Sequence, residues 1–553
     1  MGQHDTNGTS GSHTGLDALS ALREAFKGNV IEEGQGAAYE ACLWVWATSP
    51  YRKLGRPAVI LQPRGTSDVV AAVNFARENN LKLAVKGGGH GAGNPSCVDG
   101  GVMLDLSLMR GVYVDPVSKT VVAEGGCQLG DIDLETALHG LAVPLGVAPT
   151  TGMGLALNGG FSIMSRINGL TCDNTLEVQM VLADGSVVTA TQETDPELFW
   201  AVRGAGASLG VVTKIKIRAH DVTKVHAGSM VWVDDPAHNN YKAILRWMRD
   251  TASGRPDLSA NLGRMLDPHK GPMLLSMILF MGDTPVSEIE EVLKPLKDLG
   301  PVQDTVGRSS YLQVQQTLQP GLEGLKKAFP VHYESWTGGH LELSQATDEF
   351  FDKFIKVSTD DLPMPDCALT LGFLGLLGGK IKETLAPVGF KEGGSSDKLG
   401  GAWGLPDPAA HQGVHHALPA YFSLKAFFPP DLLQTRTGWF AHVDYLDWVV
   451  TVGWYDPACH EVGQGHVNKI RDLLKNDTST MESYINFVDP GVGARKLTYE
   501  DACDRVGGAA NLERIRAAKD KYDPHNFFTC HPFRPVLAAP RSEGKLNGAA
   551  AEQ

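Results

Sequence analysis

One loop of very small residues places a histidine where a ligand could meet both backbone and ring. Residues 86–97 read KGGGHGAGNPSC, and they put His90 between two apolar segments, Leu81–Val85 and Val102–Leu106, that are both predicted as strands. A glycine leaves no Cβ in the way of a ligand and reaches positive φ without strain. Successive N–H groups of such a turn can converge on an anion such as a phosphate. A lone histidine is more often structural than reactive, so the loop rather than His90 alone indicates a binding site.

Two further glycine-rich segments follow, Gly146–Gly160 (GVAPTTGMGLALNGG) and Trp200–Val212 (WAVRGAGASLGVV). The glycines of the second do not fit the GxGxxG spacing and do not open a helix after a strand, which disfavours a nicotinamide site. No GxxxxGK[ST] or HExxH occurs, so the common phosphate-loop and zinc-protease interpretations are excluded. One glycine cluster can be a set of surface turns. Three of them within about 130 residues favour a large, extended, anionic ligand.

Short elements are predicted to position these loops. Ala58–Leu61 is predicted as a strand, and a helix from about residue 66 to 80 leads from it to the first loop. A helix is expected over Leu129–His139, ending at Gly140, a residue typical of helix C-termini. Two hairpins are expected, one over residues 112–123 and one over 176–190, where Asp184-Gly185 suits a tight turn. The first third is therefore mixed α+β rather than a regular alternation of strand and helix.

The middle of the chain, from about 223 to 477, has longer helices and aromatic-rich strands. Examples are a helix over Thr284–Lys294 and strands within Gly438–Trp454. Towards the C-terminus a cationic helix, RIRAAKDKY, is expected to stop at Asp523-Pro524, where Phe527 and Phe528 could anchor it.

Composition limits the class of protein. The 553 residues are 42% hydrophobic and 20% charged, as in an ordinary globular protein with a large core. A net charge of -14 argues against nucleic acid as the main partner, because a phosphate-binding surface needs clustered Lys and Arg. The eight cysteines form no CxxC pair, so we predict reduced thiols and no metal site. We see no secretory signal and no apolar run long enough to span a membrane, and we expect an intracellular protein.

The motifs in their order resemble those of the berberine bridge enzyme-like flavoprotein oxidases, in the vanillyl-alcohol oxidase or PCMH-type FAD-binding group. The resemblance covers about residues 38–220 and 480–532 strongly, and the middle only loosely. It is carried by KGGGHGAGNPSC with VMLDLS, DLETALHGLAVPLG, PTTGMGLALNGGFSIMSRINGLTCDN, PELFWAVRGAGASLGVVT, and SYINF with KYDPHNFF.

The resemblance implies an α+β fold: a PCMH-type FAD-binding domain of two α+β subdomains, with an inserted α+β substrate domain whose antiparallel sheet is covered by helices. We place the FAD-binding domain in residues 16–222 and 478–538, the substrate domain in 223–477, and disordered tails at 1–15 and 539–553.

For the cofactor, the resemblance implies FAD held by the glycine loops. His90 matches the histidine that bonds to the flavin 8α-methyl group, a link that makes the oxidised flavin a stronger hydride acceptor. Members with two links carry a cysteine where this chain has Ala148, so we expect one covalent link only. The other expected FAD contacts are Gly87, Gly88, Gly89, Gly91, Gly93, Asn94, Pro149, Thr150, Thr151, Gly152, Gly154, Asn158, Gly159, Gly160, Asn168, Gly169, Val212, Tyr484 and Asn486.

For catalysis, Tyr484 in SYINF lies where several members place a tyrosine that faces the flavin. A tyrosine with an ordinary pKa near 10 is a poor base, so a cation or the flavin would have to lower it, and a ring that only packs on the cofactor is an equal alternative. Asn486 shares its strand face and could orient the flavin or the substrate. His442 in FAHVDY is a second candidate, although a structural role suits it better.

Three hypotheses about function remain open. The first is an oxidase that removes hydride from a medium-sized, partly apolar organic molecule, such as a secondary-metabolite intermediate. In it O2 is the electron acceptor, H2O2 is released, and a cyclisation or dearomatisation could follow. The second is a flavin-bearing cyclase in which FAD is structural and no net redox change occurs. The third is a non-catalytic FAD-binding module. The sequence does not name the substrate or the oligomeric state.

Overall fold

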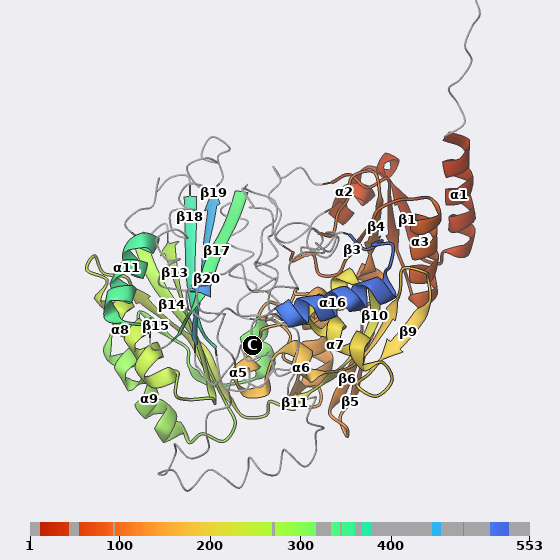
Figure 1. The fold of residues 1–553 in the computed structure, drawn as a ribbon. Coiled ribbons are helices and arrows are strands. Elements are labelled where there is room, and N and C mark those ends of the chain that lie inside the picture. The colour runs from red at the N-terminus through yellow and green to blue at the C-terminus, as the bar shows by residue number, and fades with distance from the viewer. Residues whose placement is uncertain are drawn as a thin grey trace, which may run out of the picture.

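The computed structural model of the chain describes residues 12–43, 55–91, 95–267, 271–316, 333–342, 345–359, 368–377, 445–454, 479–480 and 509–529. Figure 1 shows two halves beside each other, each with β-sheet and helices packed against it. The half formed by the N-terminal residues also contains helix α16 (Ala509–Tyr522), whereas the middle of the chain forms the other half. The α+β class predicted from the sequence is confirmed.

The N-terminal half begins with a four-stranded sheet in the order β1-β2-β4-β3. Its elements are α1 (Ser12–Ala25), β1 (Asn29–Glu32), η1 (Glu33–Gln35), α2 (Ala37–Leu43), β2 (Val59–Gln62), α3 (Thr66–Glu78), β3 (Leu83–Lys86), β4 (Val102–Asp105) and η2 (Leu106–Leu108). Strands β2, β4 and β3 are parallel, and β1 is antiparallel to β2. Helix α3 forms because its apolar residues recur at helical spacing and are fully buried: Val69, Ala72, Val73 and Ala76.

Two boundaries in this sheet differ from the prediction. The parallel register pairs Leu83 with Val102 and Lys86 with Asp105, so β3 begins and ends nearer the glycine loop than the predicted Leu81–Val85. Helix α1 begins at Ser12, inside the polar stretch 1–15 that composition assigned to a tail, while residues 1–11 and 530–553 lie outside the described part of the chain.

A second sheet of the same half is antiparallel throughout, in the order β5-β6-β10-β8-β9. Its strands and main helices are β5 (Val112–Asp115), β6 (Thr120–Glu124), α4 (Leu129–Ala137), β8 (Thr175–Val181), β9 (Val187–Ala190), α7 (Pro196–Ala205) and β10 (Val211–Arg218). Both predicted hairpins are confirmed, and Gly185 takes the positive φ that the turn between β8 and β9 requires. Shorter elements connect them: β7 (Leu141–Ala142), η3 (Met153–Asn158), α5 (Ser165–Asn168), α6 (Thr171–Asn174), η4 (Gly206–Ser208) and β11 (His220–Asp221).

The other half is one antiparallel sheet with helices against it. Its described strands are β12 (Val225–Val233), β13 (Leu258–Asp267), β14 (Gly271–Met281), β15 (Gln303–Asp304), β16 (Gly307–Ser309), β17 (Tyr333–Glu342), β18 (Ala368–Leu377), β19 (Tyr445–Trp454) and β20 (Ser479–Thr480). They follow the order β15-β12-β14-β13-β18-β19-β17-β20, with β16 beside β12. The helices are α8 (Asn239–Trp247), the π-helix η5 (Met248–Ala252), α9 (Val286–Asp298) and α11 (Asp348–Thr359). The predicted antiparallel sheet covered by helices is confirmed.

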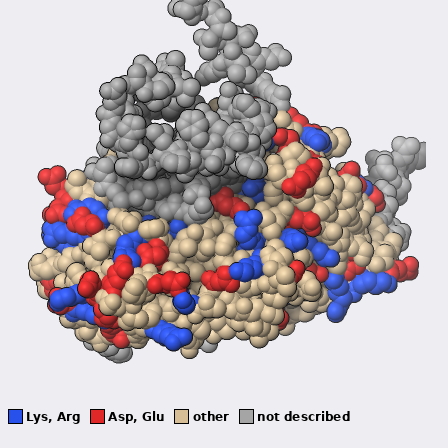
Figure 2. Space-filling model, turned by 90° about the horizontal axis from the view of Figure 1, so that it is seen from below, with Lys and Arg blue, Asp and Glu red and all other residues tan. Residues whose placement is uncertain are grey.

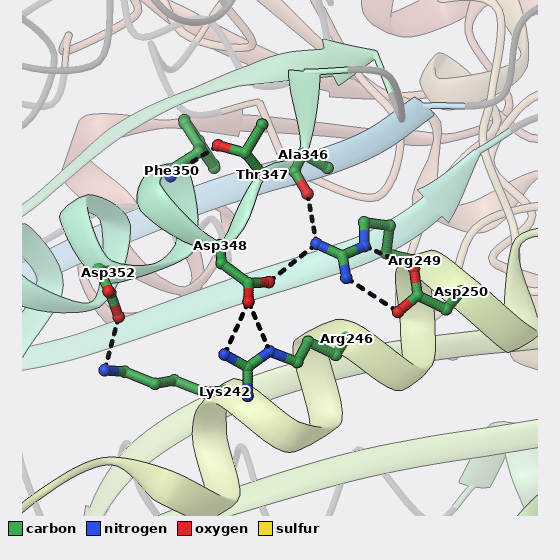
Figure 3. A network of polar contacts seen from close by, with 9 residues as sticks. All are labelled: Lys242, Arg246, Arg249, Asp250, Ala346, Thr347, Asp348, Phe350 and Asp352. Atoms are coloured by element: carbon green, nitrogen blue, oxygen red, sulfur yellow. Dashed lines mark hydrogen bonds and ion pairs between the residues drawn. The ribbon is translucent and has the colours of Figure 1, made fainter.

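Ion pairs join the helices on the outside of this half. Figure 3 shows Arg246 and Arg249 pointing to Asp348 at the start of α11, with nitrogen–oxygen distances of 2.8 and 3.0 Å. Arg249 also donates to the carbonyl oxygen of Ala346 at 3.0 Å, and Lys242 pairs with Asp352 at 2.5 Å. Exposed pairs of this kind contribute little each, so the network fixes how α8, η5 and α11 lie together more than it stabilises the fold.

Helix α16 returns the chain to the N-terminal half. Its Arg514 binds Glu197 of α7 in a bidentate pair at 2.7 and 2.8 Å and lies 4.0 Å over the Trp200 ring. The hydroxyl of Tyr522 donates to Asp195 at the other end of this contact. As predicted, the helix ends before Asp523-Pro524, and Phe528 is buried.

The surface and the cysteines agree with an ordinary globular chain. On the face in Figure 2, Lys and Arg side chains lie among Asp and Glu side chains instead of gathering in one patch. None of the helices described is both long and apolar enough to cross a membrane. The four described cysteines are thiols, not disulfides: Cys42, Cys97, Cys127 and Cys172.

Candidate functional site

The first two glycine-rich segments touch each other through their backbones. A Cβ built on Gly88 would lie 2.4 Å from the Gly152 nitrogen, and one on Gly152 would lie 2.1 Å from the Gly88 nitrogen. Only glycine permits this approach, since any side chain at either position would separate the two loops. Gly88 follows the end of β3 and Gly152 precedes the start of η3, so these two elements bring together residues that are 64 positions apart in sequence.

The same two loops border open space. A Cβ on Gly154 would meet nothing within 4 Å, and the nearest atoms to one on Gly87 would be the Gly125 oxygen at 3.8 Å and the Gly154 nitrogen at 4.0 Å. Internal packing therefore does not explain these two glycines. They leave backbone accessible to a ligand, as a phosphate-bearing cofactor requires. The predicted FAD contacts at Gly87, Gly88, Gly152 and Gly154 fit such a group.

His90 lies directly after this contact. Its Nε2 is 2.9 Å from the Thr150 hydroxyl, a hydrogen bond across the two loops. Both side chains are partly buried, so neither is sealed away from a ligand. The predicted cofactor residues His90, Thr150 and Gly152 are therefore neighbours in space.

Helix α4 holds the second loop. The backbone nitrogen of Leu129 donates to the Thr151 carbonyl at 2.8 Å, and that of Gly130 donates to the Pro149 carbonyl at 2.7 Å. These are N–H groups of the first helical turn, which have no partner inside a helix. The loop that carries Thr150 is thus fixed on both sides of that residue.

A buried ion pair that sequence reasoning missed lies at the base of the first loop. Lys86 Nζ is 3.6 Å from Asp105, whose side chain is 2% exposed, and it donates to the Cys42 carbonyl at 2.7 Å. Gln62 donates to the same carboxylate at 3.0 Å. Burial, followed by the charge of Asp105, raises the pKa of the Cys42 thiol. Lys86 is thereby fixed one residue before Gly87, although no local pattern marked it.

The second loop continues into a folded segment with two unusual glycines. Gly159 and Gly160 have φ of 98° and 85°, a region that favours glycine. Their carbonyls accept hydrogen bonds from the nitrogens of Cys172 and Thr171, both at 2.8 Å. Within η3, the Asn158 side chain donates to the Gly154 carbonyl at 3.0 Å. The predicted cofactor residues Gly154, Asn158, Gly159 and Gly160 therefore form one continuous folded segment after Gly152, called the cofactor ledge below.

A chain of side-chain hydrogen bonds holds Asn168 and Gly169. The Asn174 amide donates to the carbonyls of Asn168 and Leu170, both at 2.8 Å, and its oxygen is 2.7 Å from His220 Nε2. Burial lowers the pKa of His220 to about 4, so this ring is neutral at ordinary pH and donates to Asn174. The side-chain oxygen of Asn168 is buried without a partner among the described residues, which leaves it for a donor such as a ligand hydroxyl.

Val212 lies behind the first loop, not at its surface. It is 4% exposed, and a Cβ on Gly125 would be 2.2 Å from its carbonyl oxygen. Gly125 in turn is the neighbour of Gly87. Val212 thus supports the loop from behind.

Arg166, which the sequence did not single out, joins the two halves of the molecule. It is 1% exposed, and it extends from α5, which lies between the halves in Figure 1. Its Nε donates to the Leu258 carbonyl at 2.9 Å, and its Nη2 donates to the carbonyls of Ser253 and Arg255 at 2.9 and 3.1 Å. Ser253 and Arg255 lie in the turn that directly follows η5, which Arg249 holds against α11 (Figure 3), and Leu258 begins β13.

Apolar packing accompanies this contact between the halves. Ile163 and Met164, just before α5, are buried in one cluster with Val225 of β12 and Leu279 of β14. The segment 161–169 thus inserts against the middle sheet, while its end at Asn168 and Gly169 returns to the cofactor ledge. Arg166 could have been noticed as a charged residue in an otherwise small and apolar stretch.

Some of the predicted site residues lie in the described part of the chain, and others lie outside it. Gly89 and Gly91 belong to the described first loop, and Gly89 has φ of 70°. Outside the described residues lie Gly93, Asn94, His442, Tyr484 and Asn486. The structure therefore describes most of the predicted cofactor residues, whereas the predicted catalytic residues lie outside the described part of the chain.

Family comparisons agree with this geometry. Residues 57–191 match the FAD binding domain family, and residues 483–532 match the family described as berberine and berberine like. The first match contains both loops that meet at Gly88 and Gly152, and the second contains α16.

Similar proteins have FAD-linked names. An FAD-linked oxidoreductase of Dictyostelium discoideum is 43% identical over 36% of this chain and 43% of its own length. The (R)-6-hydroxynicotine oxidase of Paenarthrobacter nicotinovorans is 33% identical over 48% of this chain and 57% of its own. The alignments thus span about half the length of these relatives.

A solved structure extends the likeness to the whole fold. The berberine bridge enzyme-like protein 1 of Physcomitrella patens superposes with a TM-score of 0.70 at 20% identity, over 95% of this chain and all of its own. The loops, the inserted sheet and the returning C-terminal helix are thus parts of one known architecture. The chain is thus similar to FAD-linked oxidoreductases, and it carries a match to the FAD binding domain and a match to the berberine and berberine like family.

Proposed function

We propose that this protein is an FAD-dependent oxidase of a medium-sized, partly apolar organic molecule. The observation that carries the proposal is the backbone contact of Gly88 with Gly152, which builds a two-loop cradle beside His90. When bound, FAD would supply the acceptor for a hydride from the substrate, and O2 would take up the two electrons and two hydrogens as H2O2.

The cofactor would be held mainly by backbone. Gly87 and Gly154 border the open side of the cradle, and the first loop is fixed at its base by Lys86 and Asp105. His90 would carry the covalent link, in which one imidazole nitrogen would replace one hydrogen of the flavin 8α-methyl carbon. The two hydrogens lost from carbon and nitrogen, with their electrons, would be taken up by O2 as H2O2. Ala148 offers no sulfur for a second link.

The catalytic groups are proposed from the family motif. Tyr484 would take the substrate proton as hydride leaves, and Asn486 would orient the substrate or the flavin. His442 is the alternative base. Since the pKa of a free tyrosine is near 10, this role requires a neighbouring positive charge or the flavin to lower it.

The named relatives support the proposed substrate class. A relative named as an oxidase of (R)-6-hydroxynicotine supports a small organic substrate with a ring. A secondary-metabolite intermediate, with oxidation that triggers a cyclisation or dearomatisation, fits the same class. The competing proposal is a flavin-bearing cyclase without net redox change.

The deciding experiment follows the flavin spectrum of the purified yellow protein without oxygen. A panel of ring alcohols, phenols and amines, beginning with (R)-6-hydroxynicotine, is added under anaerobic conditions, and H2O2 is measured after air is admitted. The oxidase proposal predicts that at least one compound bleaches the flavin and that air restores the colour with H2O2. Conversion of a compound without bleaching would favour the cyclase.

A separate experiment tests the covalent link. Acid precipitation should leave the flavin on the wild-type protein, and His90→Ala should release it to the supernatant. Flavin released from the wild-type protein would refute the link while leaving the FAD assignment intact.

A further inference from the structure

The hydroxyl of Thr150 lies within hydrogen-bond distance of the His90 ring. The 2.9 Å separation from Nε2 is that of an ordinary hydrogen bond, and the two residues are 60 positions apart. Sequence motifs place both residues in the cofactor cradle but assign no relation between them.

Thr150 is held more firmly than a loop residue usually is. The carbonyls on either side of it, those of Pro149 and Thr151, accept hydrogen bonds from the first turn of α4 at 2.7 and 2.8 Å. The Thr151 nitrogen also donates to the Ala148 carbonyl at 2.9 Å. The Thr150 carbonyl oxygen would lie 2.7 Å from a Cβ built on Gly88, so Thr150 packs directly on the first loop.

His90, by contrast, follows three consecutive glycines. Such a segment has more conformational freedom than any other, and an imidazole on it can rotate about two side-chain bonds. A fixed partner on the opposite loop reduces that freedom. A hydroxyl is well suited because it can donate to or accept from a ring nitrogen without adding charge, so it can hold the ring in place in either neutral tautomer.

We propose that Thr150 is the positioning residue for His90: its hydroxyl sets the rotation in which the imidazole meets the flavin. The inference rests on the proposed covalent link and adds the group that prepares His90 for it. Loss of one ordinary hydrogen bond that is fully used in the reacting geometry corresponds to about a fivefold to tenfold slower attachment.

Two substitutions separate the hydroxyl from the shape of the side chain. Thr150→Val keeps the branched shape and removes the hydrogen bond, whereas Thr150→Ser keeps the hydroxyl and removes a methyl group. Thr136→Val is the matched control: it lies in α4, is fully buried, and loses a hydroxyl that bonds only to carbonyls of its own helix.

The test measures covalent flavin at successive times after expression begins. Each full-length protein is purified, precipitated with acid, and the flavin in pellet and supernatant is compared, with thermal unfolding recorded in parallel. We expect Thr150→Val to accumulate covalent flavin about fivefold to tenfold more slowly at an unchanged unfolding temperature. Thr150→Ser and Thr136→Val should follow the wild type.

The outcomes are distinguishable. Wild-type rates in Thr150→Val, or an equal loss in Thr136→Val, would overturn the role of Thr150 while leaving the link to His90 in place. Failure of Thr150→Ser to restore the rate would show that shape, not the hydroxyl, matters. Free flavin from the wild-type protein would overturn both the link and this inference.

Discussion

A buried carboxyl group at the boundary between the two halves should make the stability of this protein depend on pH. Asp133 of α4 is 2% exposed, and neither of its oxygens has a hydrogen-bond partner among the described residues. Burial raises its pKa from 3.8 to about 8. Burial, followed by the charge that Asp133 would carry, raises the pKa of the buried Tyr311, just after β16, so the two groups interact across this boundary.

The sign follows from which state holds the proton. The folded chain keeps the Asp133 proton up to about pH 8, whereas an unfolded chain releases it near 3.8. The contribution of Asp133 to the free energy of unfolding is therefore greatest at low pH and falls as the pH rises between these two values. The slope is about 1.4 kcal/mol per pH unit well below 8 and flattens as the folded group titrates, which gives a loss of about 2 kcal/mol between pH 6 and 8.

The perturbation is Asp133→Asn, which keeps the shape and removes the titration. Urea unfolding of the flavin-loaded protein at pH 6, 7 and 8 should show the variant gaining about 2 kcal/mol on the wild type over this range. Glu135→Gln, an exposed carboxyl-to-amide change in the same helix, is the control and should gain nothing. A difference between Asp133→Asn and wild type that stays constant with pH would refute the reasoning.

Three further substitutions test contacts in the cradle and between distant segments. Gly152→Ala places a methyl group on the first loop and should abolish flavin retention, measured by absorbance, whereas Gly34→Ala, which meets nothing within 4 Å, should retain it. Arg166→Met leaves buried carbonyls unsatisfied and should lower the free energy of unfolding, measured in urea, by about 3 kcal/mol. An unchanged urea midpoint would show that Arg166 does not hold the two halves together. Lys519→Met leaves the buried Asp523 carboxylate without its ion-pair partner and should lower the free energy of unfolding by about 3 kcal/mol, which is followed by proteolysis at α16. Resistance to proteolysis equal to that of the wild type would contradict this role of Lys519.

Local signals made much of the fold predictable. Asp184-Gly185 fixed the turn of a hairpin, and the burial pattern of α3 follows directly from its apolar spacing. One helix was misjudged for a local reason: α9 was expected to end at Lys294, yet it continues through Pro295 to Asp298. Leu296 is fully buried in the core of the middle sheet, and that burial outweighs the hydrogen bond that proline removes.

The motifs predict that His90 and Gly152 belong to one site, and the structure brings their two loops into contact. Their roles toward a cofactor stay predictions, and the contacts that hold the loops could not be predicted. The partners of Lys86 and Arg166 are largely backbone carbonyls of distant segments. Every residue has a carbonyl, so no residue type or spacing marks such a partner, and only the tertiary fold reveals it.

The return of α16 sets the order in which this protein can be completed during synthesis. Lys519 donates to the Ser208 carbonyl at 2.6 Å, 311 positions earlier in the chain, and to the carbonyl of Phe528 at 3.0 Å. At about 5 to 20 residues per second, the ribosome delivers Lys519 roughly 15 to 60 s after Ser208. The middle sheet has that interval to form while the N-terminal half still lacks its closing helix. The N-terminal half is therefore completed only after the whole middle of the chain has been synthesised.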